Sequence, residues 1–360
     1  MKVLVTGSAG HLGEALMGLL PTLGHTVKGL DRQPSPFTHW VGDITDRTLI
    51  RQALPGVEAI VHTATLHKPH LATHSKQAFV DTNINGTLTL LEEAQGASVD
   101  RIVFTSTTST YGRALSSPPD TPAAWVDEDL KGVTKNIYGA TKTAAEDLCA
   151  LFARNHGVHV VVLRTARFFP EADDSRAVRE GFSDVNAKAN EFLFRRVDLE
   201  DAATAHAHAL ERVRDIGFGV YVISATSPFG REDLSTLRRD PAAVVAAHYP
   251  GFSAVYAQRR FAMFADIDRV YINARARRDL GWQPRYDFGR ILQQLADGSP
   301  IGSPLARAVG SKGYHAEGFA DGHGPVLEPT PPGGARPPLV SPQPPDGVSG
   351  AGRQRPIPWG

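Results

Sequence analysis

A glycine-rich loop near the amino terminus constrains the fold of this chain more than any other feature of its sequence. Residues 2–6 form an apolar run that predicts a buried strand, and residues 12–20 have the pattern of a helix. Glycines between a strand and a helix permit a tight turn and let the backbone approach a pyrophosphate closely. The amino end of the helix stabilises the phosphate charge. We therefore predict dinucleotide binding by the loop that contains Gly7, Gly10, His11, Leu12 and Gly13.

The residues after the second predicted strand indicate which dinucleotide binds. The apolar run 26–30 ends at Asp31, about twenty residues after the loop, where an acid can accept hydrogen bonds from the adenosine ribose. Arg32 follows directly, and its guanidinium group could accommodate a ribose phosphate. The sequence therefore favours NAD, with NADP as the alternative.

Composition excludes several other classes of protein. Of the 360 residues 41% are apolar, so a substantial core is available, and Lys plus Arg equals Asp plus Glu at 38 each. This balance predicts binding neither to nucleic acid nor to a membrane. The single cysteine, Cys149, excludes an internal disulfide, and its apolar neighbours predict a buried thiol. With no signal-like or long apolar segment visible, we expect a cytoplasmic protein.

The order of apolar runs predicts an α/β fold with a doubly wound parallel sheet (Rossmann). Continuous apolar runs at 59–61, 102–104 and 158–163 alternate with helical stretches at 75–95 and 138–154. Strands that are apolar throughout are typical of a parallel sheet covered on both faces.

The same pattern predicts the division of the chain. We expect a Rossmann domain over residues 1–165, to which residues 196–225 return, and a small substrate lobe from 166–195 and 226–305. Residues 306–326 form an extension without a clear pattern. In the last 34 residues, 327–360, 10 are proline and 6 are glycine, which predicts a disordered tail.

A tyrosine and a lysine four residues apart suggest chemistry on the helix predicted at 138–154. Tyr138 and Lys142 would lie on one helix face about one turn apart. An ammonium group beside a phenol favours the phenolate and should lower a pKa that is normally about 10. The pair is therefore predicted to take a proton from an alcohol.

Together these features resemble an extended short-chain dehydrogenase/reductase of the NAD-dependent epimerase/dehydratase group. Further matches are His62-Thr63-Ala64, Asn83 before Ile84-Asn85-Gly86-Thr87, the hydroxyl run before Tyr111-Gly112, and Leu280-Gly281-Trp282. The resemblance implies that Asp43 and Ile44 lie along the adenine and that Thr63, Ala64 and Thr65 line the cofactor. The other residues that it assigns to cofactor binding are Asn83, Thr105, Tyr138 and Lys142.

The resemblance also implies a mechanism. Thr107 would hydrogen-bond the substrate alcohol and relay its proton to Tyr138, with Ser106 as the neighbouring candidate. Lys142 would bind the nicotinamide ribose and lower the pKa of Tyr138. Hydride then passes from the alcohol carbon to the nicotinamide. If the hydride returns to the opposite face of the carbonyl the reaction is an epimerisation, and if NADH leaves it is a dehydrogenation.

Departures from the family pattern limit the substrate. Sugar-nucleotide 4,6-dehydratases carry an acid pair where this chain has Thr108 and Ser109, which disfavours that subtype. Nucleotide-sugar epimerases carry an asparagine where Arg167 or Phe169 falls. Arg167 could grip a carboxylate or phosphate, or form a surface salt bridge.

The segment between Pro170 and Val197 is also short for a nucleotide-sugar site. The hypothesis is a small, sugar-like alcohol or carbonyl, such as the sugar acid of uronate dehydrogenases. His67, Thr108 and Arg167 are its candidate contacts.

Other interpretations were weighed. His62, His67, His70 and His74 have helical spacing with Asp81 nearby, but Pro69 interrupts them, and no metal site is predicted. A protein that binds the dinucleotide without turnover is the alternative from another class. The resemblance also implies a homodimer through the helix of Tyr138 and its neighbour.

Overall fold

A computed structural model describes residues 1–118 and 120–312 of the chain. The tail predicted at 327–360 and residues 313–326 of the extension lie outside the described residues.

Among the described residues, seven parallel strands form one sheet in the order β3-β2-β1-β4-β5-β7-β8. They are β1 (Lys2–Thr6), β2 (Thr26–Asp31), β3 (Trp40–Val41), β4 (Ala59–His62), β5 (Arg101–Thr107), β7 (His159–Thr165) and β8 (Phe218–Ile223). The strand order reverses between β1 and β4, which in such sheets opens a ligand crevice at the carboxyl ends of these strands. The predicted doubly wound fold is confirmed.

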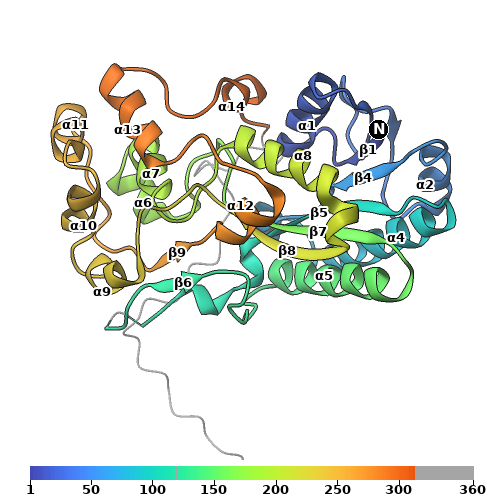
Figure 1. The fold of residues 1–360 in the computed structure, drawn as a ribbon, viewed down its shortest axis with the longest axis horizontal. Helices are drawn as coiled ribbons and strands as arrows, with labels where there is room; N and C mark the ends of the chain where they lie inside the picture. The colour runs from blue at the N-terminus through green and yellow to red at the C-terminus, as the bar shows by residue number, and fades with distance from the viewer. Residues whose placement is uncertain (119, 313–360) are drawn as a thin grey trace, which may run out of the picture. The chain divides into compact units, whose positions relative to one another are not determined.

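Helices cover both faces of this sheet (Figure 1). One face carries α1 (His11–Thr22) and α8 (Leu199–Ile216), and the other carries α2 (Arg47–Ala53), α4 (Gly86–Gly96) and α5 (Ile137–Asn155). Alternate strand residues point to opposite faces. In β5, for example, Val103 belongs to the core under α1 and α8, and Phe104 to the core under α5. Both faces are apolar, which is why these strands have continuous apolar sequences.

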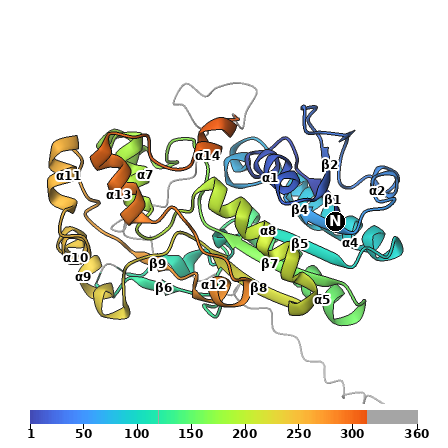
Figure 2. The same ribbon diagram turned by 45° about the horizontal axis from the view of Figure 1, so that its top comes forward.

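A smaller lobe follows the carboxyl ends of β5, β7 and β8. It has a two-stranded parallel sheet of β6 (Ala124–Val126) and β9 (Arg269–Tyr271). Figure 2 shows its helices gathered at one end of the large sheet. They are α6 (Arg176–Gly181), α7 (Asp184–Glu191), α9 (Leu234–Leu237), α10 (Pro241–His248), α11 (Phe252–Arg259) and α13 (Phe288–Asp297). Ligands of parallel sheets collect at the carboxyl edge, so the lobe lies at the edge where a ligand site is expected.

Two elements differ from the predicted domain boundaries. The helix α12 (Ala274–Leu280), which ends at Gly281 as predicted, packs with Trp282 into the core of the large domain, although the sequence placed residues 226–305 in the lobe. The helix α14 (Pro304–Val309) packs on α1 and α8. These short helices carry too few apolar residues for their sequence to indicate which core receives them.

The helix predicted at 75–95 is divided. It begins as α3 (Lys76–Phe79), widens into a π-helix at Val80–Asn85, and continues as α4. None of the helices in the described part of the chain is both long and apolar enough to cross a membrane.

Candidate active site

Tyr138 lies in the first turn of α5, next to the end of β5. The Asn136 side chain begins the helix by accepting a hydrogen bond from Gly139 N at 2.9 Å. The Tyr138 ring packs with Leu66 and Phe79, and 8% of the residue is exposed. The Thr107 side chain lies beside the phenol and favours its ionised form. The structure therefore brings together the predicted base and the predicted relay.

Lys142 lies one turn further along α5 and is 2% exposed. Its Nζ donates to the Thr105 carbonyl oxygen at 2.7 Å and lies 3.9 Å from the centre of the Phe104 ring. Burial lowers the pKa of Lys142 to about 7, while the Cys149 and Glu146 side chains act in the opposite direction. The ammonium group is directed at β5.

The predicted effect of Lys142 on Tyr138 needs a correction. Burial raises the pKa of the Tyr138 phenol to about 12, and the hydrogen bond from Thr107 opposes this rise only in part. Helical spacing placed the two side chains on one face, as predicted. The helical spacing alone did not show that burial of the phenol would have a larger effect on its pKa than the nearby ammonium group.

The hydroxyl run 105–110 divides into separate roles. Thr105 Oγ1 lies 2.8 Å from the buried His206 Nε2, and Ser106 Oγ donates to the Glu146 carboxylate. Thr107 Oγ1 accepts from Ser109 N at 3.1 Å. Thr108, a predicted substrate contact, is buried in the short turn that follows. Ser106, the alternative relay, is thus hydrogen-bonded to Glu146, whereas Thr107 lies beside Tyr138.

The glycine loop has the backbone geometry that dinucleotide binding requires. Gly7 has φ +75°, and a side chain on Gly13 would place its Cβ 1.9 Å from Gly7 O. Among the described side chains none caps the amino end of α1, so its first amide groups are oriented for a phosphate. Asp31 Oδ2 accepts from Ala9 N at 3.0 Å. The loop therefore fits a dinucleotide.

The predicted adenine residues lie on the far side of that loop. Ile44 is buried in the core beneath α4, and the Asp43 side chain accepts hydrogen bonds from the amide and hydroxyl of Thr45. Arg32 Nε lies 3.5 Å from Asp43 Oδ2, and both side chains are partly exposed.

Asn83 holds the loop after β4 in place. Its Oδ1 accepts from Leu66 N and Thr65 Oγ1 at 2.9 and 3.0 Å, and its Nδ2 donates to Leu66 O and to Thr141 on α5, both at 3.0 Å. Thr63 Oγ1 donates to Thr6 O at 2.7 Å. Through these contacts Asn83 shapes the predicted cofactor-lining loop, which includes Ala64, against the helix of Tyr138.

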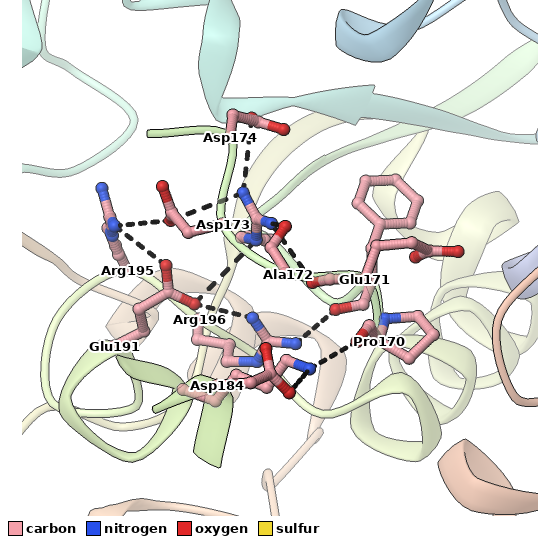
Figure 3. Close-up of polar contacts among 12 residues, drawn as sticks. Pro170, Glu171, Ala172, Asp173, Asp174, Asp184, Glu191, Arg195 and Arg196 are labelled. Carbon is pink, nitrogen blue, oxygen red and sulfur yellow. Dashed lines mark hydrogen bonds and ion pairs between the residues drawn. The ribbon is translucent and has the colours of Figure 1, made fainter. Parts of the chain in front are cut away.

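Arg167 lies in a cluster of charges after β7 that we call the arginine–carboxylate cluster. Its members are Arg167, Asp173, Asp174, Glu191, Arg195 and Arg196. Figure 3 shows how its members Asp173, Glu191 and Arg195 face one another. Arg196 Nη1 donates to Glu191 at 2.7 Å, and Arg167 Nη2 donates to the Ala172 carbonyl oxygen at 2.7 Å. Burial opposes ionisation of Glu191, but the three guanidinium groups hold its pKa well below the usual range. Arg167 thus belongs to a partly buried network of ion pairs. The predicted alternative, a surface salt bridge, gives only part of these contacts.

The segment after β7 also contacts the loops after β1 and β4. The ring of Phe169 stacks on His67 with centroids 5.0 Å apart, and Lys68 Nζ lies 2.8 Å from Asp174 Oδ2. Glu171 lies 3.0 Å from His11 Nε2 in the glycine loop. His67 therefore lies in the loop after β4 and against the segment after β7, and its contact with substrate stays a prediction.

Sequence reasoning missed Glu171, Asp174 and Glu191. The sequence showed that residues 171–174 are polar, but it did not show which side chains they would contact. Ser311 Oγ also donates to Glu171, at 2.8 Å, and the residues around Ser311 had given no signal.

Comparison with known proteins places these features in a family. The model of the NAD dependent epimerase/dehydratase family matches residues 3–224, which include the glycine loop, Thr107, Tyr138 and Lys142. The chain belongs to this family. The match confirms the resemblance seen in the sequence, and NAD dependence is part of the family's description.

Curated family members with different activities are similar to the chain. The UDP-glucose 4-epimerase of Rhizobium meliloti (strain 1021) is 28% identical over 327 residues, which cover 81% of this chain and 95% of that enzyme. The L-arabinose 1-dehydrogenase (NAD(P)(+)) of Haloferax volcanii is 30% identical over 171 residues, or 45% of this chain and 65% of that enzyme. Family membership is therefore compatible with both epimerase and dehydrogenase chemistry.

Solved structures of the family share the fold. A short-chain dehydrogenase/reductase superfamily protein from Agrobacterium tumefaciens, with bound NAD, has a TM-score of 0.59 at 21% identity and covers 86% of this chain and 97% of its own. The UDP-glucose 4-epimerase of Thermotoga maritima, with UDP-glucose, has a TM-score of 0.57 at 21% identity and covers 82% and 98%.

Proposed function

We propose that the protein catalyses NAD-dependent hydride transfer at a hydroxyl-bearing carbon of a sugar-like substrate, as an epimerase or a dehydrogenase. One observation carries the proposal. At the carboxyl end of β5, the Thr107 side chain lies beside the Tyr138 phenol and favours its ionised form, and the buried Lys142 lies one turn away. Once ionised, the Tyr138 oxygen can take a proton from an alcohol through a hydroxyl relay, and dinucleotide binding alone does not require this pair of residues.

The side chains would divide the work as follows. The substrate hydroxyl donates its proton through Thr107 to Tyr138, and the hydride on the same carbon leaves with its electron pair. NAD supplies the hydride acceptor when bound, and its positive ring opposes the effect of burial on the Tyr138 pKa. The cofactor would be held by the amide groups of the glycine loop, by Asp31 and by Lys142. NADP stays the alternative because Arg32 is adjacent.

A sugar-acid or other alcohol dehydrogenase is the second candidate, and the arginine–carboxylate cluster favours it. The Arg167 guanidinium group contacts Asp173, Asp174 and Glu191 within 4.0 Å, and the Ala172 carbonyl. A diphosphate would have to compete with these carboxylates and approach their negative charge. A smaller substrate with one carboxylate, or with no charge, incurs less of that cost.

A cofactor-linked screen tests the proposal. Purified protein is incubated with NAD and with sugar acids, neutral sugars, polyols or UDP-sugars, and NADH absorbance and product stereochemistry by NMR are followed. Accumulation of free NADH is expected for a dehydrogenase, and a new epimer without net NADH is expected for an epimerase. Binding of NAD with no conversion in any class would support the non-catalytic alternative. Tight UDP-sugar binding by calorimetry would contradict the small-substrate hypothesis.

A further inference from the structure

A buried carboxylate, Glu146, lies behind the candidate catalytic pair. It is one helical turn after Lys142 on α5, and 6% of the residue is exposed. Its Oε1 accepts from Ser106 Oγ and its Oε2 accepts from Arg164 Nη2 at 2.7 Å, while Arg164 Nε lies 3.1 and 3.2 Å from the two oxygens. All the hydrogen bonds of this carboxylate therefore lead to the large sheet.

The two partners of Glu146 lie side by side on that sheet. Ser106 of β5 is paired in register with Arg164 of β7, and Thr107, the next residue of β5, is the candidate relay. Glu146 thus joins α5, which carries Tyr138, to the strand end that carries Thr107. The separation of α5 and β5 therefore sets the distance between Thr107 and Tyr138.

We propose that Glu146 is a positioning residue of the reaction, which fixes α5 against the ends of β5 and β7 and supplies the negative charge that faces the Lys142 ammonium group. The proposal rests on the proposed function, because it assigns Glu146 a part in the chemistry of Tyr138 and Lys142. Arg164 neutralises Glu146 from the side of β7 and also stacks over the Tyr111 ring, with its Cζ 4.9 Å from the ring centre. Glu146 and Arg164 form an ion pair at 2.7 Å, and Lys142 lies one helical turn before Glu146 on α5.

Few titratable groups face Lys142 besides Glu146. Tyr138 and Cys149 lie on its own helix, and His62 lies on β4, where burial and then the charge of Lys142 lower the His62 pKa to about 3. The contact from β5 is made by the Thr105 carbonyl and the Phe104 ring. Burial raises the pKa of the Cys149 thiol, so Glu146, one turn from Lys142 on the same helix, is the acidic group whose effect on Lys142 a substitution can test.

The substitution Glu146→Gln tests this role, because glutamine keeps the shape and can still accept from Ser106. Loss of the negative charge should lower the Lys142 pKa by about one pH unit. The titration of the Lys142 Nζ is read by NMR in the protein alone, and the alkaline limb of the activity profile should move to lower pH by the same amount. Asp147→Asn, which removes an exposed charge from the next position of α5, is the matched control and should leave both unchanged.

Two further variants separate charge from position. Glu146→Asp keeps the charge but shortens the reach to Ser106 and Arg164, so the rate should fall while the Lys142 pKa stays near its original value. Arg164→Met leaves Glu146 without its counter-charge and should move the Lys142 pKa upward, which gives a test of opposite sign if Glu146→Gln does not fold.

A Lys142 pKa that is the same in folded Glu146→Gln and Asp147→Asn protein would overturn the inference, even in an active enzyme. A rate that falls equally at every pH would do so too, since a purely structural contact predicts that result. If the Lys142 pKa shifts but the original protein converts no substrate, the proposed function fails instead.

Discussion

The glycine loop and the arginine–carboxylate cluster lie at the same carboxyl edge of the sheet, but they are built in different ways. The loop is fixed by backbone contacts between near neighbours, as in the 1.9 Å approach that a Cβ on Gly13 would make to Gly7 O. The cluster is fixed by charges from three segments, with Arg167 after β7, Glu191 at the end of α7 and Arg195 beyond it. A local backbone constraint can be recognised in the sequence from the spacing of its glycines. The partners in a network of long charged side chains cannot be recognised in this way.

The largest effect is expected for Gly13→Ala, which tests the backbone side of this comparison. The added methyl group meets the Gly7 backbone and cannot be moved aside, so the free energy of unfolding should fall by about 3 kcal/mol and NAD affinity should fall with it. Chemical denaturation and fluorescence titration with NAD measure the two effects.

Gly18→Ala in the same helix is the control, since nothing lies within 4 Å of its Cβ position. It should stabilise the protein by about 0.5–1 kcal/mol, because alanine is the better helix former. If the free energy of unfolding and the NAD affinity were the same in the two variants, the close approach of Gly13 to Gly7 would be contradicted.

A smaller effect is expected for Asp31→Asn, which tests whether the loop's acid binds the cofactor. The carboxylate accepts from Ala9 N and Gln33 N, and a single amide oxygen replaces it poorly. Loss of a charged acceptor should weaken NAD binding by about 2 kcal/mol, with less effect on NADP. Calorimetry of both cofactors measures the change.

Asp46→Asn serves as its control, because Asp46 caps α2 and asparagine caps equally well. NAD affinity should not change in this variant. Unchanged NAD affinity in Asp31→Asn would remove Asp31 from the cofactor site.

The smallest effect is expected for Arg167→Met, which tests the cluster. Removal of one guanidinium group leaves Asp173 and Glu191 with less counter-charge, so the free energy of unfolding should fall by about 1–2 kcal/mol. NAD affinity should stay the same while the KM for substrate changes. Arg176→Met, which removes the exposed ion pair with Glu180, should cost less than about 0.5 kcal/mol. A change in NAD affinity in Arg167→Met would mean that the two regions are not separable.

Most of the large domain could be predicted from the sequence because its strands are apolar throughout and its glycine loop has few conformational solutions. Tyr138 and Lys142 were identified by their spacing on a helix, and Thr107 by the resemblance to the family; the structure places Thr107 beside Tyr138. The direction of the Tyr138 pKa was not predictable, since it depends on burial by Leu66 and Phe79 from another segment.

The lobe was harder to predict. Its strands β6 and β9 have three residues each and lie far apart in the chain, so neither shows a periodicity of its own. Glu146 was passed over for a related reason: a glutamate in a helix is ordinary, and only the structure shows that Ser106 and Arg164 meet it.

The most direct test of the account is the rate of NAD reduction in a single turnover by Tyr138→Phe, measured with a substrate found in the screen. Phenylalanine keeps the ring packed on Phe79 and removes only the phenolic oxygen. Because general base catalysis contributes about 10²–10⁴-fold, hydride transfer should slow by at least about 100-fold while NAD affinity is unchanged. Hydride transfer at the original rate in this variant would show that Tyr138 is not the base.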